Sequence, residues 1–325
     1  MLKHTINQLQ AMNFYFLCTY KALSMQRPFN ISPRNTLKGR HKEIYEFELP
    51  DHNIDDKVVQ SFGEEWSKFH QFSQEDIDQL GEMYFDIITD EMVNERTYGF
   101  DLGCGTGRWT KVLTSRIGFM EAIDPSDAIY TADELLKNDD NVRLSRASSD
   151  RIPFDDETFD FGMSIGVLHH IPDTQKAMRN CVEKVKKGGY FYTYLYYNFE
   201  DRGFLFKTLF GIVDGVRQVV SSLSPRLKKF ICDIIAIVIY MPLVLLARLF
   251  NKVGMDSIAK RIPLYFYHDQ SFYIIRNDAL DRFGTALEQR FSKQEVITMM
   301  KHAGLDDIVV SDGAPYWHAV GKRVR

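Results

Sequence analysis

The stretch TYGFDLGCGTGRWTKVL, residues 97–113, decides the fold class. Its first residues predict a short strand, and from Gly107 onward its apolar residues have helical spacing. Between the two, Gly103, Gly105 and Gly107 alternate along one turn. Glycine lets the backbone approach a ligand closely, and the start of the following helix offers free N–H groups. The stretch therefore predicts a strand–turn–helix unit that binds a ligand.

The alternation of strands and helices continues along the chain. Further strands are expected at residues 119–124, 141–147, 158–168 and 190–197, with helices at 126–138 and 174–187. After a break near Asn198, a helix at 292–305 and strands at 306–312 and 316–323 follow. Such alternation predicts a parallel sheet with helices on both faces. We expect an α/β fold with a Rossmann-like, doubly wound sheet of seven strands, mostly parallel with an antiparallel final strand.

This pattern divides the 325 residues into three parts, which agrees with a chain longer than a usual single domain. Residues 1–60 form an N-terminal extension, residues 61–198 and 292–325 form the ligand-binding domain, and residues 199–291 form a helical insert or lid. The apolar run behind Lys3 is interrupted by polar residues, which argues against a signal peptide. Translation could begin at Met1 or at Met25.

Composition narrows the class of protein. The net charge of −4 is too small to indicate a nucleic-acid binder. The cysteines Cys18, Cys104, Cys181 and Cys232 are scattered, without C-x-x-C spacing or neighbouring histidines. They predict free thiols in a reducing compartment, with neither a disulfide framework nor a zinc site. We therefore expect a cytoplasmic protein without a bound metal.

The glycine turn differs from two common nucleotide-binding turns. A dinucleotide fingerprint needs its third glycine at position 108, where this chain has Arg108. A P-loop needs Gly-Lys-Ser/Thr at the start of the helix, and that sequence is absent here. The turn therefore favours another ligand.

The spacing Asp-x-Gly-x-Gly-x-Gly at 101–107 resembles motif I of the class I S-adenosylmethionine-dependent methyltransferases. Asp124 ends the second strand, 23 residues after Asp101. The run ASSDRIPFDDETFDFGMSIGVLHHIPD at 147–173 is similar to later motifs of the small-molecule, methyltransferase-11-like branch. VKKGGYFY at 185–192 looks like the family's turn into the fifth strand. The resemblance covers about residues 97–197 and 292–321.

The resemblance implies S-adenosyl-L-methionine as the cofactor. Backbone of the glycine turn would hold its methionine part, Asp101 would orient its ammonium group, and Asp124 would bind the ribose. The family commonly has an aspartate for the adenine after the third strand, but this chain has Ser148, so Ser148, Asp150 or backbone would make that contact. The implied set is Asp101, Gly103, Cys104, Gly105, Thr106, Gly107, Asp124, Pro125, Ser126, Ser148, Ser149, Asp150 and Ile165.

His169 and His170 follow the fourth strand, at the edge where open α/β sheets bind ligands. Methyl transfer requires a base only when the acceptor must lose a proton. Imidazole titrates near neutral pH, so one of the two histidines is the best candidate for that catalytic role. The alternative is that both cap the following helix or pack the loop. The pair gives O-methylation a slight preference over C- or N-methylation.

We expect a methyltransferase that acts on a small-molecule or lipid-precursor acceptor. The alternative is a non-catalytic regulator or scaffold that binds S-adenosylmethionine or S-adenosylhomocysteine. Nucleic acid is not an expected partner, because no Asn/Asp-Pro-Pro-Tyr/Phe motif follows the fourth strand. The sequence names neither the acceptor nor the oligomeric state.

The insert is basic and apolar. Residues 200–261 hold ten Lys and Arg against five Asp and Glu, and residues 234–247 are uncharged. That run is shorter than the roughly 20 residues of a membrane span, and Asp233 and Pro242 also weigh against one. One alternative is a lid over the ligand site, which is favoured because buried lid helices are also continuously apolar. The other is peripheral contact of residues 204–252 with the inner face of the membrane, which would collect a lipid-linked acceptor.

Overall fold

The computed structural model describes residues 25–49, 52–66, 73–200, 203–284 and 287–325. The chain divides into two compact units. Unit 1 comprises residues 1–200 and 289–325, and unit 2 comprises residues 201–288. The expected insert, residues 199–291, has nearly the same bounds as unit 2.

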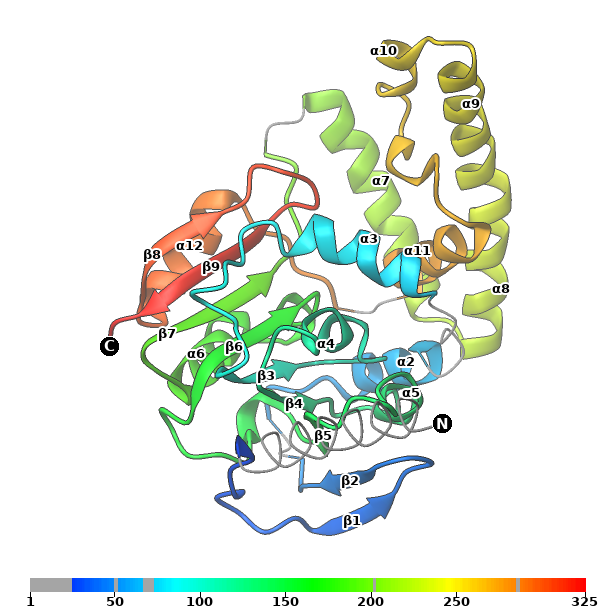
Figure 1. Cartoon of the computed structure of the whole chain (residues 1–325). Helices are drawn as coiled ribbons and strands as arrows, with labels where there is room; N and C mark the ends of the chain where they lie inside the picture. Colours follow the sequence, from blue (N-terminus) through cyan, green and yellow to red (C-terminus); the bar gives the residue numbers. More distant parts are fainter. Residues whose placement is uncertain (1–24, 50–51, 67–72, 201–202, 285–286) are drawn as a thin grey trace, which may run out of the picture. The chain divides into compact units, whose positions relative to one another are not determined.

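Unit 1 is built on one mixed sheet of nine strands in the order β1-β2-β5-β4-β3-β6-β7-β9-β8 (Figure 1). The pairs from β2 through β7 are parallel, and β9 runs antiparallel to both β7 and β8. This confirms the expected mostly parallel sheet with an antiparallel final strand. The strands are β1 Asn35–Lys38, β2 Glu43–Glu46, β3 Tyr98–Leu102, β4 Phe119–Ile123, β5 Val142–Arg146, β6 Phe159–Ile165, β7 Val185–Tyr194, β8 Leu305–Val310 and β9 His318–Arg323.

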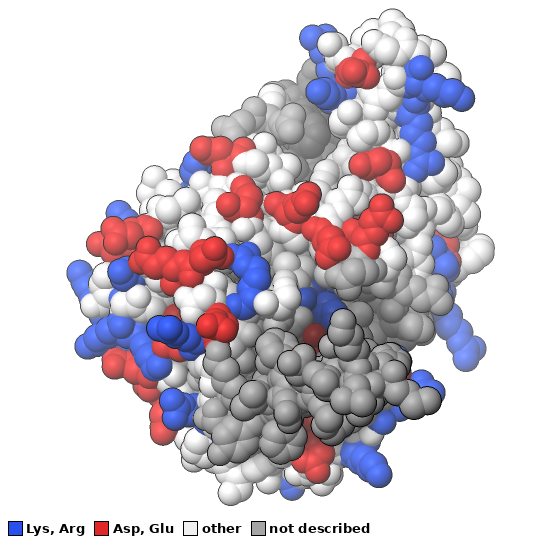
Figure 2. Space-filling model, in the orientation of Figure 1, with Lys and Arg blue, Asp and Glu red and all other residues white. Residues whose placement is uncertain are grey.

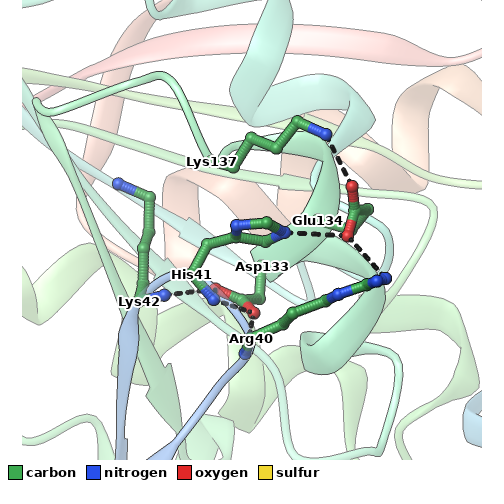
Figure 3. A network of polar contacts seen from close by, with 6 residues as sticks. All are labelled: Arg40, His41, Lys42, Asp133, Glu134 and Lys137. Carbon is green, nitrogen blue, oxygen red and sulfur yellow. Dashed lines mark hydrogen bonds and ion pairs between the residues drawn. The ribbon is translucent and has the colours of Figure 1, made fainter.

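The expected count of seven strands was wrong, because the N-terminal extension contributes a hairpin to the sheet edge. β2 pairs in parallel with β5, and β1 pairs with β2. Asp133 holds the turn of this hairpin: its carboxylate accepts from the backbone N–H groups of Arg40, His41 and Lys42, at 2.5, 3.0 and 2.6 Å (Figure 3). Gly39 belongs to the same turn, and a Cβ there would lie 2.5 Å from a carbonyl oxygen.

Helices cover both faces of the sheet, as expected. One face packs its Phe100 and Phe191 against Met178 of α6 and Met300 of α12. The other face packs Met120 and other apolar residues against α4 and α5. In the described residues, the helices of unit 1 are α2 Asp56–Trp66, α3 Gln74–Tyr84, α4 Arg108–Leu113, α5 Ile129–Leu135, α6 Thr174–Lys184 and α12 Lys293–His302, with the 3-10 turns η1 Ser149–Arg151 and η2 Leu168–His170.

All regular elements in the described residues of unit 2 are helical. It contains α7 Phe204–Ser221, α8 Pro225–Ile235, the π-helical turn η3 Ala236–Tyr240, α9 Met241–Lys252, α10 Asp256–Ala259, the 3-10 turn η4 Tyr265–Tyr267 and α11 Phe272–Gly284. α8, η3 and α9 follow one another without a break, and residues 226–252 are long and apolar enough to cross a membrane by length and composition alone. From the sequence, the uncharged run of residues 234–247 was judged too short to span a membrane. The uncharged run is only the middle of a 27-residue helix.

Candidate functional site

The order of the strands places a switch point beside β3. The chain runs from β3 to β4 on one side, and β6 pairs with β3 on the other. In open α/β sheets, ligands bind outside the carboxyl ends of the strands at such a point. The loops after β3 and β6 meet there, because a Cβ at Gly103 would lie 2.4 Å from a side-chain carbon of Val167.

The glycine turn after β3 exposes backbone to open space. Gly103 and Gly105 have φ values of +76° and +53°, which side chains disfavour. A Cβ at Gly105 would meet nothing within 4 Å, so a ligand can approach this peptide directly. Gly107 serves packing instead, since a Cβ there would lie 2.7 Å from Leu136.

Asp101 ends β3 with a carboxylate that is fully buried and incompletely bonded. Its Oδ2 accepts a 2.7 Å hydrogen bond from the Thr110 hydroxyl. Its Oδ1 has no hydrogen-bond partner within the described part of the chain. Burial raises the pKa of Asp101 to about 7, with the Asp124 charge adding to the effect and the Thr110 hydrogen bond opposing it. A buried oxygen without a donor indicates a place for a ligand group. An ammonium group fits it.

Asp124 follows β4 and keeps acceptor capacity for a ligand. Its Oδ2 accepts from the Gly105 N–H at 2.8 Å, and its Oδ1 accepts from the Ser126 N–H and hydroxyl at 2.8 and 2.6 Å. A carboxylate offers about four lone pairs, so about one remains on Oδ2. The Ser126 hydroxyl also accepts from the Ala128 N–H, which commits it to the turn. The Pro125 carbonyl accepts from the Arg146 side chain.

The segment after β5 contains Ser148, Ser149 and Asp150. These residues differ in the hydrogen-bonding capacity that remains for a ligand. The Asp150 carboxylate has donors from Asn53, Lys176 and Asn180, and the His52 ring lies 3.2 Å from it. The Ser149 carbonyl accepts from the Asn180 side chain. The Ser148 hydroxyl is buried and has no partner among the residues that the structure describes. The Ser148 hydroxyl is therefore a buried open polar group, whereas the Asp150 carboxylate is committed to its donors.

Three further residues of the expected cofactor set are buried beside the turn. Cys104 and Thr106 are each 2% exposed, and Ile165, at the end of β6, is 4% exposed. Burial, with the charges of Asp124 and Asp101 adding to it, raises the pKa of the Cys104 thiol well above its usual range. Cys104 is therefore a neutral wall residue and not a nucleophile.

The two histidines form the turn η2 after β6. His169 is fully buried, and neither of its ring nitrogens has a hydrogen-bond partner in the described residues. Burial, followed by the charges of His170 and Arg290, lowers the pKa of His169 well below its usual value. The imidazole is thus neutral near pH 7 and has a nitrogen able to accept a proton. The His170 ring contacts Phe62, with 5.0 Å between their centroids.

Tyr196 is a site residue that the sequence analysis did not single out. Its ring centroid lies 3.9 Å from that of His169 and 5.6 Å from that of His170. Tyr194 lies against Tyr196 from the same segment. The alternation in the run YFYTYLYY places these two tyrosines on one side of β7 and its extension, and this was the available signal.

In the described part of the chain, neither a cluster of potential metal ligands nor a sizeable cavity coincides with these residues. Within the described ranges, no group of three or more His, Cys, Asp or Glu side chains could hold a metal ion. A cavity of about 660 Å³ opens between α3 and α4, and its lining residues include Glu82, Asp86 and Lys111. None of the expected site residues lines it.

Residues 100–193 match the family model described as a methyltransferase domain. The demethylmenaquinone methyltransferase of Staphylococcus aureus strain JH9 is 31% identical over 108 residues, which are 32% of this chain and 44% of that protein. The same protein from strain Newman gives the same values. The chain thus spans less than half the length of the curated relatives that it matches.

Solved structures show weaker likenesses. Human N-acetylserotonin methyltransferase in complex with S-adenosylmethionine has a TM-score of 0.48 at 13% identity, over 85% of this chain and 60% of that one. An S-adenosylmethionine-dependent methyltransferase from Aquifex aeolicus has a TM-score of 0.41 at 13% identity, over 77% and 97% of the two chains. Neither likeness bears on the acceptor. Residues 100–193 thus match a methyltransferase domain, and the glycine turn and the mostly parallel sheet agree with that match.

Proposed function

We propose that this protein transfers a methyl group from S-adenosylmethionine to a small-molecule or lipid-precursor acceptor. The observation that carries the proposal is a row of open polar groups on three neighbouring strands. Asp101 Oδ1 lies near the carboxyl end of β3, and the remaining lone pair of Asp124 and the Ser148 hydroxyl follow β4 and β5. These three strands are adjacent in the sheet. Neighbouring strands lie roughly 4.8 Å apart, so the row spans about 10 Å. This suits a ligand with an ammonium group, a ribose and a base in succession.

The chain's own part in the reaction is positioning and proton transfer. When bound, the cofactor supplies a methyl group on a positively charged sulfur. Asp101, Gly105 and Asp124 would fix the cofactor, and correct alignment of two reactants is worth on the order of 7–11 kcal/mol. A neutral His169 could take the proton of a hydroxyl or an acidic carbon as the methyl group arrives. The rings of His169, His170 and Tyr196 would form the wall nearest the acceptor.

A lipid-precursor acceptor is supported by the relatives from Staphylococcus aureus, which are named demethylmenaquinone methyltransferases. The aromatic rings that surround His169 favour a flat acceptor, because aromatic pairs attract beyond their buried area. The slight preference for O-methylation still depends only on the availability of a neutral histidine. A panel of phenolic, quinol and carboxylate acceptors would separate O- from C-methylation by the product's mass spectrum.

Calorimetric titration of the purified protein with S-adenosylmethionine and S-adenosylhomocysteine, with NAD as the control ligand, tests the cofactor. We expect micromolar binding of the first two and none of NAD. Asp124→Ala should weaken that binding at least tenfold, because it removes a ribose acceptor and frees the Gly105 N–H. The matched control is Asp127→Ala, whose carboxylate is 65% exposed on the same loop and pairs with Arg146.

Unchanged affinity in the Asp124→Ala variant would contradict the ribose role. Binding of S-adenosylhomocysteine without methyl transfer to any member of the acceptor panel would favour the alternative, a non-catalytic regulator or scaffold. Methyl transfer to one acceptor would exclude that alternative.

A further inference from the structure

Unit 2 has an unusually apolar surface. Among the described residues, 17 of the 20 large hydrophobic side chains that are exposed belong to this unit. Seven of them form what we call the apolar stripe, a single line along the helix from α8 through α9. Its members are Leu227, Phe230, Ile234, Val238, Leu245, Leu249 and Val253, between 42% and 63% exposed. Exposed apolar patches of this kind mark sites of interaction with a partner or a membrane.

The opposite side of the same helix is fixed inside unit 2 by polar contacts. Asp233 pairs with Arg276 of α11, and the Tyr240 hydroxyl bonds Asp278 of α11 at 3.1 Å. Farther along, Arg248 donates to two backbone carbonyls that precede α11, at 2.6 and 2.7 Å. Only a third of the apolar window is buried within the protein. Among the described residues, this helix therefore has one face packed inside unit 2 and one face that stays exposed along its length.

The charges around the apolar stripe are basic. Unit 2 has twelve Lys and Arg against eight Asp and Glu. Three of these acids, Asp214, Asp233 and Asp278, are each bonded to an arginine of the same unit. Basic residues remain exposed or half-exposed near the two ends of the stripe: Arg226, Lys229, Lys252, Lys260 and Arg261. Asp256 and Asp269 are exposed acids in that neighbourhood.

On the side that Figure 2 draws, the surface over α9 and α10 is mostly uncharged, with Lys and Arg side chains and some Asp or Glu side chains beside it. An apolar line with basic ends is the composition of helices that lie in a membrane interface. Anionic headgroups attract Lys and Arg, and each basic residue near such a surface contributes about a fivefold factor in binding. The charge pattern thus selects an anionic lipid surface over a neutral protein groove.

A spanning orientation conflicts with the contacts of the committed face. Crossing the bilayer would remove Asp233 and Tyr240 from α11, or would draw Arg276 and Asp278 into the hydrocarbon with them. Ionisable groups inside a bilayer are costly. A helix that lies flat keeps these contacts in the protein and turns only the apolar stripe toward lipid.

We propose that unit 2 docks on an anionic phospholipid membrane with the helix of residues 226–252 parallel to its surface and the apolar stripe among the acyl chains. This docking goes beyond the methyl transfer proposed above and does not depend on it. The sequence alone favoured a lid over the ligand site, and we now prefer the alternative of peripheral membrane contact. A membrane surface is where a lipid-linked acceptor would be collected.

The test is sedimentation of the full chain with vesicles of phosphatidylcholine alone and of phosphatidylcholine with about a third phosphatidylglycerol. We expect binding to the anionic vesicles that weakens with added salt. Val238→Glu and Leu249→Glu should each reduce partitioning at least tenfold. Replacing Arg226, Lys229 and Lys252 by Gln together should reduce it about a hundredfold on anionic vesicles only. The matched control is Val309→Glu, an exposed apolar residue of β8 at 47% exposure, which should bind like the unchanged protein.

Three results would overturn the proposal. Vesicle binding that resists high salt and alkaline carbonate would indicate a spanning helix. Absence of vesicle binding, together with a dimer in ultracentrifugation that Val238→Glu dissociates, would assign the stripe to a second copy of the chain. Absence of vesicle binding with a melting temperature several degrees lower in Val238→Glu would show that protein already covers the stripe. Circular dichroism of each variant checks that the helices have formed.

Discussion

Two regions of unit 1 hold an aspartate that is almost completely buried, and the protein treats the two differently. Asp133 on α5 is 1% exposed, and three backbone N–H groups of the β1–β2 turn donate to it. Asp101 at the end of β3 is fully buried, and its Oδ1 has no donor in the described residues. The first carboxylate closes a structural turn. The second leaves an acceptor facing the place where the family's cofactor would bind.

Buried histidines show the same difference. His318 on β9 has a carbonyl oxygen 2.7 Å from Nδ1 and an Asp86 oxygen 2.6 Å from Nε2. His169 has no partner at either nitrogen among the described residues. Buried polar groups are normally bonded, because leaving one unsatisfied costs about 1–3 kcal/mol. We therefore expect buried side chains with hydrogen-bond partners to determine the stability of this protein. Buried side chains without such partners should instead affect ligand binding and turnover.

The largest effect on stability is expected at Arg143, a buried side chain whose hydrogen bonds are all made within the protein. Its guanidinium donates to both Glu121 oxygens at 2.8 and 2.7 Å and lies 3.9 Å from the Phe29 ring. Arg143→Ala should lower the free energy of unfolding by about 3–5 kcal/mol, because Glu121 would be left as an unpaired buried charge. Urea unfolding measures this. Arg151→Ala removes only an exposed pair with Glu48 and should change stability by less than about 1 kcal/mol. Equal losses in both variants would contradict the distinction.

At His169, one substitution should change turnover without lowering stability. His169→Phe keeps a ring of similar shape but removes two buried unsatisfied nitrogens, so the melting temperature should hold or rise. Turnover on an acceptor that must lose a proton should fall about a hundredfold or more. His318→Phe is the matched variant, and it should lose about 2 kcal/mol of stability with its two hydrogen bonds. Full turnover in His169→Phe would show that this histidine only packs the loop.

The sequence predicted buried polar groups without hydrogen-bond partners better than it predicted the contacts of the bonded ones. Asp101 and the glycine turn belong to one continuous motif, so spacing alone could identify them. The donors to Asp150 come from two distant segments, residue 53 and one face of α6 at residues 176 and 180, and no local pattern joins either segment to Asp150. The β1–β2 hairpin escaped notice because its strands have four residues each and its partner β5 lies about 100 residues away. Position within the chain carries little information about such long-range contacts.

The long helix of unit 2 was misjudged for a different physical reason. Pro242 normally interrupts a helix, because it lacks an N–H and its ring clashes with the preceding turn. Here it is the second residue of α9, directly after the π-helical turn 236–240. The helix thus continues through Pro242, with a π turn instead of the regular α-helical ladder directly before it.

Asp133→Ala should have a smaller effect on stability than Arg143→Ala and none on cofactor affinity. The substitution leaves three N–H groups of the hairpin turn without their acceptor, and some of them can turn to water, so a loss of about 2 kcal/mol is expected. Glu134, the next residue, pairs with His41 and Lys137 on the surface (Figure 3). Glu134→Ala should change stability little. A fall in cofactor affinity in Asp133→Ala would show that the hairpin supports the site after all.

The smallest effect is a pH dependence that comes from Asp101. Burial raises the pKa of Asp101 to about 7 from 3.8, so in the ligand-free protein its charge destabilises the fold above pH 7. That destabilisation disappears as the pH falls from 7 toward 4, because the folded protein binds the proton more tightly than the unfolded chain. Cofactor affinity should move in the opposite direction, since a protonated Asp101 no longer attracts an ammonium group. Between pH 8 and pH 6 the affinity should fall about tenfold, which is about 1.4 kcal/mol. Calorimetry on the unchanged protein and on Asp101→Asn measures it, and the variant should bind weakly without this dependence. If the cofactor affinity of both proteins depends on pH in the same way, Asp101 Oδ1 does not bind the ammonium group. Asp101 and Asp133 would then not differ in function.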